Sequence, residues 1–476
     1  MSSNATTAAT SALVWIRRDL RLQDHSALSF ATHNFERVYV AFLFDSEILK
    51  NLQDKADRRI TFIVESLIQI QNRLQKAGTD LLMLRGVACQ EIPKIARELN
   101  VKCVCTNRDY EPYALSRDQK VQENLKEVGV EFRSFKDHVI FEEREVLSQQ
   151  KTPFRVFSAY KNAWLKEFKA AEVQHRIVKK GPLAQAQIPK SLRSFVDINE
   201  LGFKKANLWV EAGEKAGLER LKAFTDVISD YSKKRDFPAE AATSGLSVHL
   251  RFGTVSIREC VRVAKSSRSA GSQTWLSELI WRDFYQMILF NFPEVVRTAF
   301  KPECAAIDWP GAREDFQRWC EGVTGYPLVD AAMRNFNATG WMHNRLRMIV
   351  AMFLTKDLLC DWRWGEEYFA RHLLDFDLAA NNGGWQWSAS TGADAQPYFR
   401  IFNPVTQSEK FDPKGEYIKA HVPELSRLSE KDIHAPWLAK ADSLTKAGVD
   451  LGKNYPYPIV DHKTQRLKSI ALFKKI

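Results

Sequence analysis

The sequence predicts an α/β N-terminal domain with a doubly wound parallel sheet, a long linker, and a larger all-α C-terminal domain. Two observations lead to this fold class. Between residues 11 and 140, short aliphatic and β-branched runs alternate with amphipathic stretches, as in parallel strands that are joined by helices. From about residue 206, strand signals nearly vanish and helical periodicity continues to the C-terminus.

Five strands are expected in the first region. They are ALVWI (12–16), VYVAFLF (38–44), DLLMLRG (80–86), VKCVCTN (101–107) and VEFRSF (130–135). Between the second and third strands, apolar residues recur at helical spacing from Ile60 to Leu74, and Gly78 stands where a helix would end. No GxGxxG follows the first strand, so the sequence does not support an ordinary dinucleotide fold.

Residues 141–205 are polar, rich in Gln and Lys, and poor in periodicity. Such a stretch is typical of a connector between domains. The predicted organisation is therefore an α/β domain at 11–140, a linker at 141–205 and a helical domain at 206–476.

The composition indicates a globular protein, with 45% hydrophobic and 27% charged residues among 476. A net charge of +11 without long single-sign blocks is compatible with a polyanionic partner. The N-terminus lacks the features of a secretory signal, and no apolar stretch is long enough to span a membrane. Seven cysteines without a CxxC motif favour reduced thiols over disulfides or zinc. We expect a cytoplasmic protein without a metal centre.

The stretch WLSELIWRDFYQMIL places aromatic and charged side chains at helical spacing. Its side chains Trp275, Glu278, Trp281, Arg282 and Tyr285 fall along one side of the expected helix. A surface helix with a Glu278–Arg282 pair would explain the charges alone. Two indoles and a phenol interleaved with those charges favour the wall of a ligand site.

A second stretch, TGWMHNRLRMIV, places Asn344 and Met348 on one helical face, four residues apart. An Asn amide both donates and accepts, which suits the edge of a base, and a Met side chain fills a soft pocket against flat rings. The alternative is a core methionine beside a solvated asparagine.

The stretch TSGLS brings hydroxyl groups to an expected helix start, at Thr243, Ser244 and Ser247. Hydroxyls and free backbone N–H groups at such a position suit a phosphate as well as an ordinary cap. Tyr231 and Arg235 could add further donors to a phosphate.

The stretch DFDLAANNGGWQWSAS (375–390) combines two acids, two asparagines, two glycines and two tryptophans. Its glycines are expected to let the backbone turn closely. Nine of the thirteen tryptophans lie between residues 275 and 387, an enrichment that either a core or a functional site would explain.

In order along the chain, these blocks resemble the DNA photolyase and cryptochrome family, and most closely the bacterial class I cyclobutane pyrimidine dimer photolyases. The stretches that carry the resemblance are RRDLRLQDHSAL (17–28), TSGLS (243–247), WLSELIWRDFY (275–285), TGYPLVDAAMR (324–334), TGWMHNRLRM (339–348), DLAANNGGWQWSASTG (377–392) and PYFRIFNPVTQSEKFDP (397–413). They cover nearly the whole chain.

The resemblance implies an FAD site in the helical domain, with reduced, anionic FAD as the active form. The residues implied for the diphosphate side are Tyr231, Thr243, Ser244, Gly245, Leu246 and Ser247. Asp375, Asp377 and Asn381 would lie along the flavin and ribityl side, with Asn381 facing flavin N5. Arg347 would pair with Asp375, and Arg282 and Phe376 complete the implied cofactor contacts.

The implied reaction is light-driven splitting of a cyclobutane pyrimidine dimer that is flipped out of ultraviolet-damaged DNA. Trp281 and Trp387 would wall the dimer pocket, and Tyr285 is a further implied substrate-binding residue. Glu278 and Asn344 would bond base edges, and Met348 would pack below. The implied strand contacts are Arg235, Arg345, Arg400 and Gln407, and Arg282 is a further implied DNA-binding residue.

Three further tryptophans match an electron chain that reduces oxidised flavin in light, namely Trp385, Trp362 and Trp309. Family members commonly bind a second, antenna chromophore in or beside the α/β domain. Ala114 stands where folate binders often have a glutamate, whereas EPY (111–113) is similar to deazaflavin binders, so methenyltetrahydrofolate and 8-hydroxy-deazaflavin both stay open. A bacterial monomer, associated with the nucleoid when bound to DNA, is expected.

Related functions would leave different residues in the sequence. A (6-4) photolyase would carry histidines at 344 and 348, a DASH-type cryptochrome usually lacks an indole matching Trp387, and a signalling cryptochrome often has a long C-terminal extension. A cryptochrome-type photoreceptor stays an alternative. So does a non-catalytic, aromatic-rich nucleic-acid binder, which would leave the acids and TSGLS without a purpose. A flavin-dependent oxidoreductase is a third alternative, but no nicotinamide motif is present.

Overall fold

The computed structural model describes residues 10–192 and 197–475. The chain forms two compact units. Unit 1 contains Met1–Val146, Trp164–Thr225 and Ser244–Arg268, and unit 2 contains Leu147–Ala163, Asp226–Thr243 and Ser269–Ile476. Each unit is therefore assembled from stretches that are separated in the sequence.

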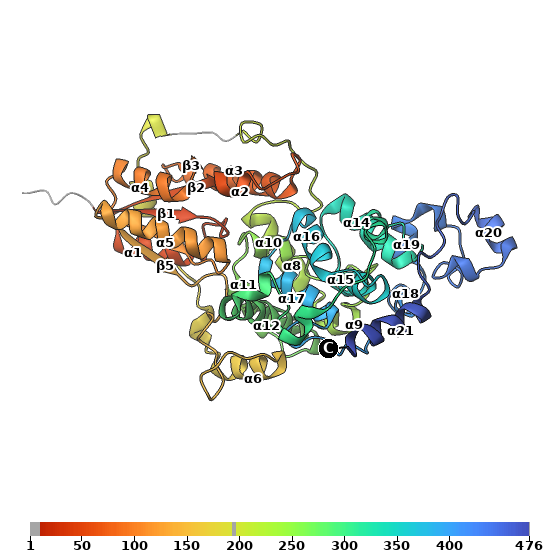
Figure 1. The fold of residues 1–476 in the computed structure, drawn as a ribbon. Coiled ribbons are helices and arrows are strands. Elements are labelled where there is room, and N and C mark those ends of the chain that lie inside the picture. Colours follow the sequence, from red (N-terminus) through yellow and green to blue (C-terminus); the bar gives the residue numbers. More distant parts are fainter. Residues whose placement is uncertain (1–9, 193–196, 476) are drawn as a thin grey trace, which may run out of the picture. The chain divides into compact units, whose positions relative to one another are not determined.

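Unit 1 is built on a sheet of five parallel strands, in the order β3-β2-β1-β4-β5 (Figure 1). The strands are β1 (Ser11–Ile16), β2 (Arg37–Asp45), β3 (Leu81–Gly86), β4 (Cys103–Asn107) and β5 (Glu131–Phe135). All five predicted strands and the parallel sheet are confirmed. Strands β1, β2 and β4 are almost wholly buried, as expected for strands that are covered on both faces.

Helices cover both faces of this sheet. The helices between the strands are α1 (Ser26–Asn34), α2 (Ser46–Leu49), α3 (Arg58–Lys76), α4 (Ala88–Glu98) and α5 (Pro112–Glu127). Right-handed crossovers put α1 and α3 on one face and α4 and α5 on the other, because the strand order reverses between β3 and β4. Ile92 of α4 and Val121 of α5 accordingly pack in one cluster with Leu13 and Trp15. The predicted doubly wound fold is confirmed.

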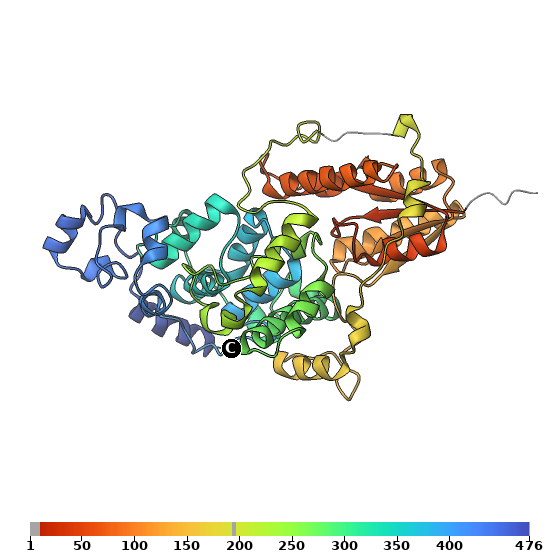
Figure 2. The ribbon, with the colours of Figure 1, turned by 180° about the vertical axis from the view of Figure 1, so that it is seen from behind.

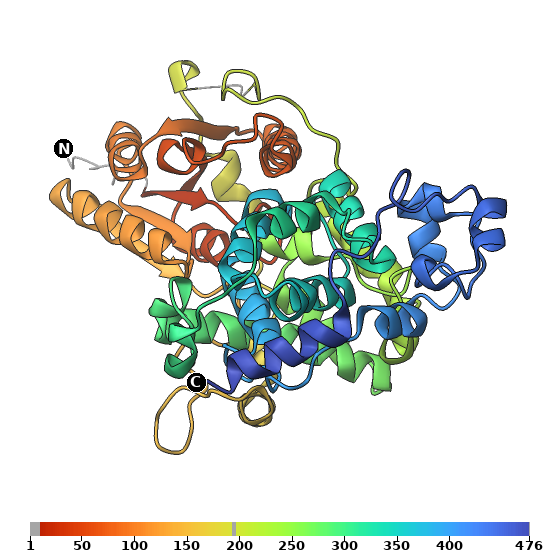
Figure 3. The same cartoon turned by 45° about the vertical axis from the view of Figure 1, so that its right-hand side comes forward.

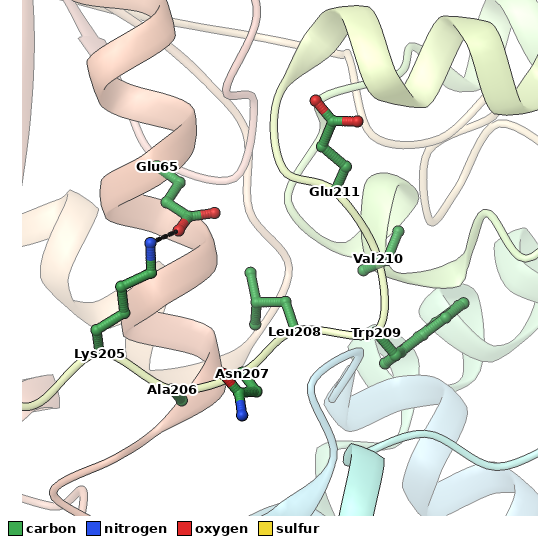
Figure 4. A pocket seen from close by; sticks show the side chains of 8 residues that line it. All are labelled: Glu65, Lys205, Ala206, Asn207, Leu208, Trp209, Val210 and Glu211. Atoms are coloured by element: carbon green, nitrogen blue, oxygen red, sulfur yellow. Dashed lines mark ion pairs between the residues drawn. The ribbon is translucent and has the colours of Figure 1, made fainter.

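The remaining helices of unit 1 come from later parts of the chain. They are η1 (Ala170–Val173), α7 (Lys180–Ala184), η2 (Lys190–Leu192), α8 (Glu214–Thr225), α10 (Ser247–Arg251) and α11 (Ile257–Lys265). A pocket lies between α3 and the extended stretch 205–211 (Figure 4). Lys205 forms an ion pair of 2.8 Å with Glu65 at its edge. None of the side chains that line it belongs to the predicted site.

A buried ionic network holds the centre of unit 1 together. Asp137 is fully buried and contacts two guanidinium groups, Arg21 Nη2 at 2.5 Å and Arg258 Nη2 at 2.8 Å. Asp24 accepts from Arg258 Nε at 2.9 Å, so α11 is tied to the loop that follows β1. Burial alone would raise the pKa of Asp137, but Arg21 and Arg258 outweigh it and hold that pKa well below its usual value.

Unit 2 consists mainly of helices and loops, and its longest stretch, from Ser269 onward, is drawn in green to blue in Figure 2. Its α-helices are α9 (Tyr231–Lys234), α12 (Ala270–Asn291), α13 (Arg313–Glu321), α14 (Pro327–Thr339), α15 (Asn344–Met352), α16 (Trp362–His372), α17 (Leu378–Ala389), α18 (Pro404–Phe411), α19 (Glu416–His421), α20 (Ala441–Ala447) and α21 (His462–Phe473). Helix α6 (Phe157–Glu167) begins in unit 2 and ends in unit 1. Across the described residues, no helix is both long and apolar enough to cross a bilayer.

The core of unit 2 is one large apolar cluster whose buried members run from Trp319 of α13 to Tyr455. Helix α15 runs directly into a π-helical turn, Phe353–Asp357, which α21 contacts. Helix α21 is the dark blue helix beside the C-terminus in Figure 3. Such turns are rare and often lie at functional sites. Here the turn buries Lys356, whose Nζ donates to the carbonyl of Ala389 at 3.1 Å, and this bond fixes the end of α17.

Candidate functional site

Helix α12 carries the mixed aromatic and charged side chains that the sequence predicts on one side. Trp275 is buried, so it belongs to the core. Glu278, Trp281, Arg282 and Tyr285 are partly exposed along the same helix, as a ligand wall requires.

Helix α12 packs closely against the turn before α9. A Cβ atom on Gly271 would lie 1.9 Å from the carbonyl oxygen of Ile228, so only glycine permits this approach. Tyr231 is buried at the start of α9, and Arg235 follows at its end.

The stretch DFDLAANNGGWQWSAS forms a helix rather than a turn. Asp377 caps α17, with its carboxylate accepting from the backbone N–H of Ala380 at 3.1 Å. The expectation that the glycines serve a turn is therefore wrong. A Cβ atom on Gly383 would lie 2.2 Å from Tyr285 Cδ1, so this glycine lets α17 pack directly on α12.

The two acids of this stretch are held by fixed partners. The predicted ion pair is present, because Arg347 Nη2 lies 2.7 Å and 3.0 Å from the two carboxylate oxygens of Asp375. Gln286 Nε2 donates to Asp377 at 3.1 Å. Sequence reasoning missed Gln286, although it continues the series Glu278, Arg282 at spacing i+4 along α12.

Asn381 is buried in α17 and bonds to a second residue that the sequence analysis missed. Its Nδ2 donates to Glu366 Oε1 at 2.8 Å and to the Glu366 backbone carbonyl at 3.1 Å. This directs the amide nitrogen toward α16 and turns the amide oxygen the other way. Burial raises the pKa of Glu366 to about 7, although the bond from Asn381 opposes the rise.

The side chains of this part of unit 2 fit a polar, ring-shaped cofactor. They offer a guanidinium paired with Asp375, a fixed carboxylate at Asp377 and an oriented amide at Asn381. Gln286 Oε1 is buried and has no hydrogen-bond partner among the described residues. Such a group calls for a donor from a ligand, because buried polar atoms are rarely left unpaired. Phe376 lies between the two acids and packs on the main core cluster.

The TSGLS stretch has a backbone that favours close approach of a ligand. Thr243 ends one segment of unit 2, and Ser244 begins a segment of unit 1. Gly245 adopts a left-handed φ of +58°, which glycine allows at little cost, and Leu246 and Ser247 lead into α10. The guanidinium of Arg220 lies beside Gly245, where an added Cβ would meet it at 2.2 Å. No motif pointed to Arg220, which supplies positive charge beside Gly245.

Besides those on α12, three predicted lesion residues lie on α15 and α17. Asn344 is exposed in the first turn of α15, and Met348 is partly exposed one turn later on the same face. Trp387 is partly exposed on α17. His343 caps α15 by accepting from the Arg345 N–H, and burial lowers its pKa to about 4. His343 is therefore neutral at pH 7 and has a structural task.

Two of the predicted strand contacts are engaged in ion pairs. Arg235 Nη1 lies 2.5 Å from Glu278 Oε1, so two residues that were predicted for different parts of the ligand contact each other. Arg345 Nη2 lies 2.9 Å from Asp236, and its guanidinium stacks 4.4 Å above the Phe411 ring. Arg400 is exposed, and Gln407 is half-buried on α18.

The three tryptophans of the predicted electron chain meet in one hydrophobic cluster. Trp385 and Trp362 are 3% and 2% exposed within it, and Trp309 packs against it from a partly exposed position. Gly365 of α16 makes room for the Trp385 ring, since a Cβ atom there would lie 2.1 Å from it. The exposure rises from the first two rings to Trp309, as a path from the interior to the surface would require.

One set of side chains in unit 1 has the composition of a metal site, Asp24, His175 and Glu259. Arg262 contacts the carboxylates of both Asp24 and Glu259. The guanidinium therefore supplies the positive charge that these two acids require.

Replacing Glu366 by Gln should remove a pH dependence of stability. The carboxyl of Glu366 has a folded pKa of about 7, against an ordinary 4.5, so the folded state holds its proton more tightly. As the pH rises from about 4.5 to 7, the carboxyl becomes charged and destabilises the folded protein. Between about pH 5 and pH 8, the wild type should lose about 2 to 3 kcal/mol of unfolding free energy relative to Glu366→Gln, as measured by urea denaturation. The control variant Glu367→Gln changes an exposed neighbour, and its stability should depend on pH as that of the wild type does. A parallel pH response in all three proteins would contradict this account.

Family models, relatives and solved structures match nearly the whole chain. Residues 275–475 match the FAD binding domain of DNA photolyase, and residues 12–179 match the DNA photolyase domain. A deoxyribodipyrimidine photo-lyase of Vibrio cholerae is 40% identical over 97% of this chain and 99% of its own. A class III photolyase of Agrobacterium tumefaciens superposes with a TM-score of 0.91 at 35% identity, covering 100% and 99% of the two chains. A photolyase of Sulfolobus tokodaii, solved with two FAD molecules, superposes with a TM-score of 0.85 at 32% identity. The match covers 98% of this chain and 100% of the other. The chain belongs to the DNA photolyase family.

Proposed function

We propose that this protein is a light-dependent DNA repair enzyme, a deoxyribodipyrimidine photo-lyase that splits cyclobutane pyrimidine dimers with FAD as its cofactor. The observation that supports it most strongly is the 40% identity, over nearly the full length of both chains, to an enzyme of that name. The match to the FAD-binding domain supports the cofactor.

Two groups of residues would hold FAD, one with fixed polar partners and one around the TSGLS stretch. When bound, reduced FAD supplies a photoexcited electron for the dimer and takes it back after the dimer has split. The Arg347–Asp375 pair and Asp377, held by Gln286, would bind polar edges of the flavin and its ribityl chain. Asn381, held by Glu366, would present its amide oxygen to flavin N5. Tyr231, Thr243 and the stretch 244–247 would bind the diphosphate, with Arg220 adding charge.

The lesion would be held between flat rings. The exposed parts of Trp281 and Trp387 would stack on the two bases of the flipped dimer, because indoles offer large apolar faces at low entropic cost. Asn344 would bond a base edge, and Met348 would fill the space beneath. Glu278 would need to exchange its Arg235 partner for a base edge, which would release Arg235 to a phosphate. Arg345, Arg400 and Gln407 would complete the strand contacts.

Reactivation of oxidised enzyme would use Trp385, Trp362 and Trp309, in the order from the flavin to the surface. The electron would travel in the opposite direction. Indole is the most easily oxidised of the ordinary aromatic rings, and all three share one apolar cluster. In that role Trp309 passes an electron inward and is regenerated at the surface.

The finer proposals concern the second chromophore and the setting. Residues 11–140 would hold an antenna chromophore, with folate and deazaflavin still open, and residues 206–476 would form the FAD-binding domain, joined by a linker at 141–205. A relative solved with two FAD molecules supports the presence of some second chromophore. The protein would act as a monomer in a bacterial cytoplasm, at the nucleoid when bound to DNA.

A repair assay tests the central proposal. The purified protein should contain FAD and should restore ultraviolet-treated oligothymidine under blue light, with no repair in the dark, as measured by loss of dimers on chromatography. An identical sample kept in darkness is the control. Light-independent repair, or flavin-loaded protein without repair, would refute the proposal.

A further inference from the structure

The Trp281 ring is stacked on a residue from far away in the sequence. Phe157, the first residue of α6, lies parallel to it, with ring centroids 3.7 Å apart and an interplanar angle of 9°. Phe284 meets the same indole edge-on at 5.5 Å and 83°, and Tyr285 at 5.3 Å and 35°. All four residues belong to unit 2, so the contacts lie within one compact body.

Phe157 is itself held firmly in place. Its side chain is buried, and it meets Phe284 edge-on at 5.8 Å and 74°. Its backbone N–H donates to the carboxylate of Asp394. Asp394 has a φ of +48°, a left-handed conformation that is uncommon for a residue with a side chain and that is found most often where the surroundings enforce it.

The anchor of Phe157 leads directly to the second lesion tryptophan. Asp394 lies in the loop that follows α17, and Gln396 of this loop donates its backbone N–H to the carbonyl of Trp387 at 3.3 Å. A short path of bonds and ring contacts thus runs from Trp387 through the loop to Asp394, Phe157 and finally Trp281. The plane of one indole is set relative to the segment that carries the other.

Phe157 covers one face of the Trp281 indole. Because the indole is nonetheless partly exposed, its opposite face is the one that a ligand can reach. A side chain that is already fixed loses less rotamer entropy when a ligand stacks on it, and affinity improves accordingly. A leucine of similar apolar bulk at position 157 would fill the space without offering a flat surface.

We propose that Phe157, anchored by Asp394, is a positioning residue that holds the Trp281 ring in the plane that receives a flipped pyrimidine dimer. This inference rests on the proposed function, because it assigns Trp281 to the lesion. Phe157 is buried behind the indole, so it acts through Trp281 and contacts neither DNA nor FAD.

The test compares Phe157→Leu and Phe157→Tyr with the wild type. Phe157→Leu should weaken binding to dimer-containing oligothymidine by about three- to tenfold, the value of an aromatic pair expressed as affinity, with little change for undamaged DNA. Phe157→Tyr keeps a flat ring and should restore lesion binding. FAD content and the absorption spectrum should match the wild type in both variants. If Phe157→Leu loses FAD, Asp394→Ala takes its place as the test variant. It removes the anchor of Phe157 but no aromatic ring, and it should weaken lesion binding by the same factor.

A double-mutant cycle separates positioning from a general structural role. In a Trp281→Ala background, Phe157→Leu should cause almost no additional loss of lesion affinity, because its partner is gone. Phe154→Leu alters a ring of the same segment that contacts Tyr160 instead, and it should leave lesion affinity unchanged. Equal affinity of wild type and Phe157→Leu, or full additivity with Trp281→Ala, would overturn the inference. Failure of wild-type light-dependent repair would instead refute the proposed function.

Discussion

Phenylalanine in place of Trp309 is expected to abolish nearly all light-driven reduction of oxidised FAD, while repair by enzyme that was chemically reduced beforehand stays nearly unchanged. Trp309 is the partly exposed member of the three-tryptophan cluster, where an oxidised ring can be re-reduced from solution. Phenylalanine keeps an apolar ring against Phe473, which Trp309 meets edge-on at 6.0 Å, but it is far harder to oxidise. The measurement is the flavin absorption spectrum under blue light with an external thiol, followed by repair of dimers after reduction by dithionite.

The matched control is Trp437→Phe. Trp437 also packs partly buried on the main cluster of unit 2, through an edge contact with Tyr326, and it is not part of the predicted chain. This variant should photoreduce FAD as the wild type does. Loss of both photoreduction and repair in Trp309→Phe would show that Trp309 has a structural task, and unchanged photoreduction would show that another residue donates the electron.

Replacing Asp137 by Ala is expected to destabilise the protein by about 3 to 5 kcal/mol, because two buried guanidinium groups lose a shared carboxylate. The side chains of Asp137, Arg21 and Arg258 are 0%, 3% and 3% exposed, so water cannot take the place of the missing charge. Ser26 would also lose the acceptor of its backbone N–H, at 3.1 Å. Urea denaturation monitored by circular dichroism gives the change in unfolding free energy.

The control for this variant is an exposed ion pair in the same unit. Glu131→Ala removes the partner of Arg133 at 2.6 Å, where the two side chains are about half exposed, and it should cost less than about 1 kcal/mol. Because the folded pKa of Asp137 is depressed, its contribution should be complete at neutral pH and should fade only as pH falls below the ordinary range of a carboxyl. Equal losses in the two variants would contradict the role of burial.

The parts of the fold that local sequence determines were predicted closely. The run VYVAFLF lies inside β2 (Arg37–Asp45), and Gly78 follows the end of α3 with a φ of +88°, as its place after a periodic apolar stretch implies. A strand that is buried on both faces must be apolar throughout, and a helix end must satisfy its backbone groups. Both requirements produce sequence patterns that extend over only a few residues, so they can be recognised in the sequence.

The site was predictable where a motif fixes neighbours, and not where distant segments meet. The pairing of Arg347 with Asp375 followed from the resemblance. The glycines of the stretch DFDLAANNGGWQWSAS were expected to let the backbone turn closely, whereas Gly383 lies inside α17 and packs against Tyr285. Glu366 and Phe157 carry no local signal, since a glutamate in a polar helix and a phenylalanine in a Gln/Lys-rich stretch show their partners only after folding.

The separated stretches of unit 2 have a consequence for synthesis and for recombination. Residues 147–163, including Phe157, leave the ribosome well before Trp281, and chains fold as they are made, so this segment must wait for its partner. A gene fragment that begins after residue 163 would encode α12 without the ring that supports its indole. An exchange of catalytic parts between relatives would therefore succeed only when the early segment travels with the late one, which makes this protein harder to shuffle than its two compact units suggest.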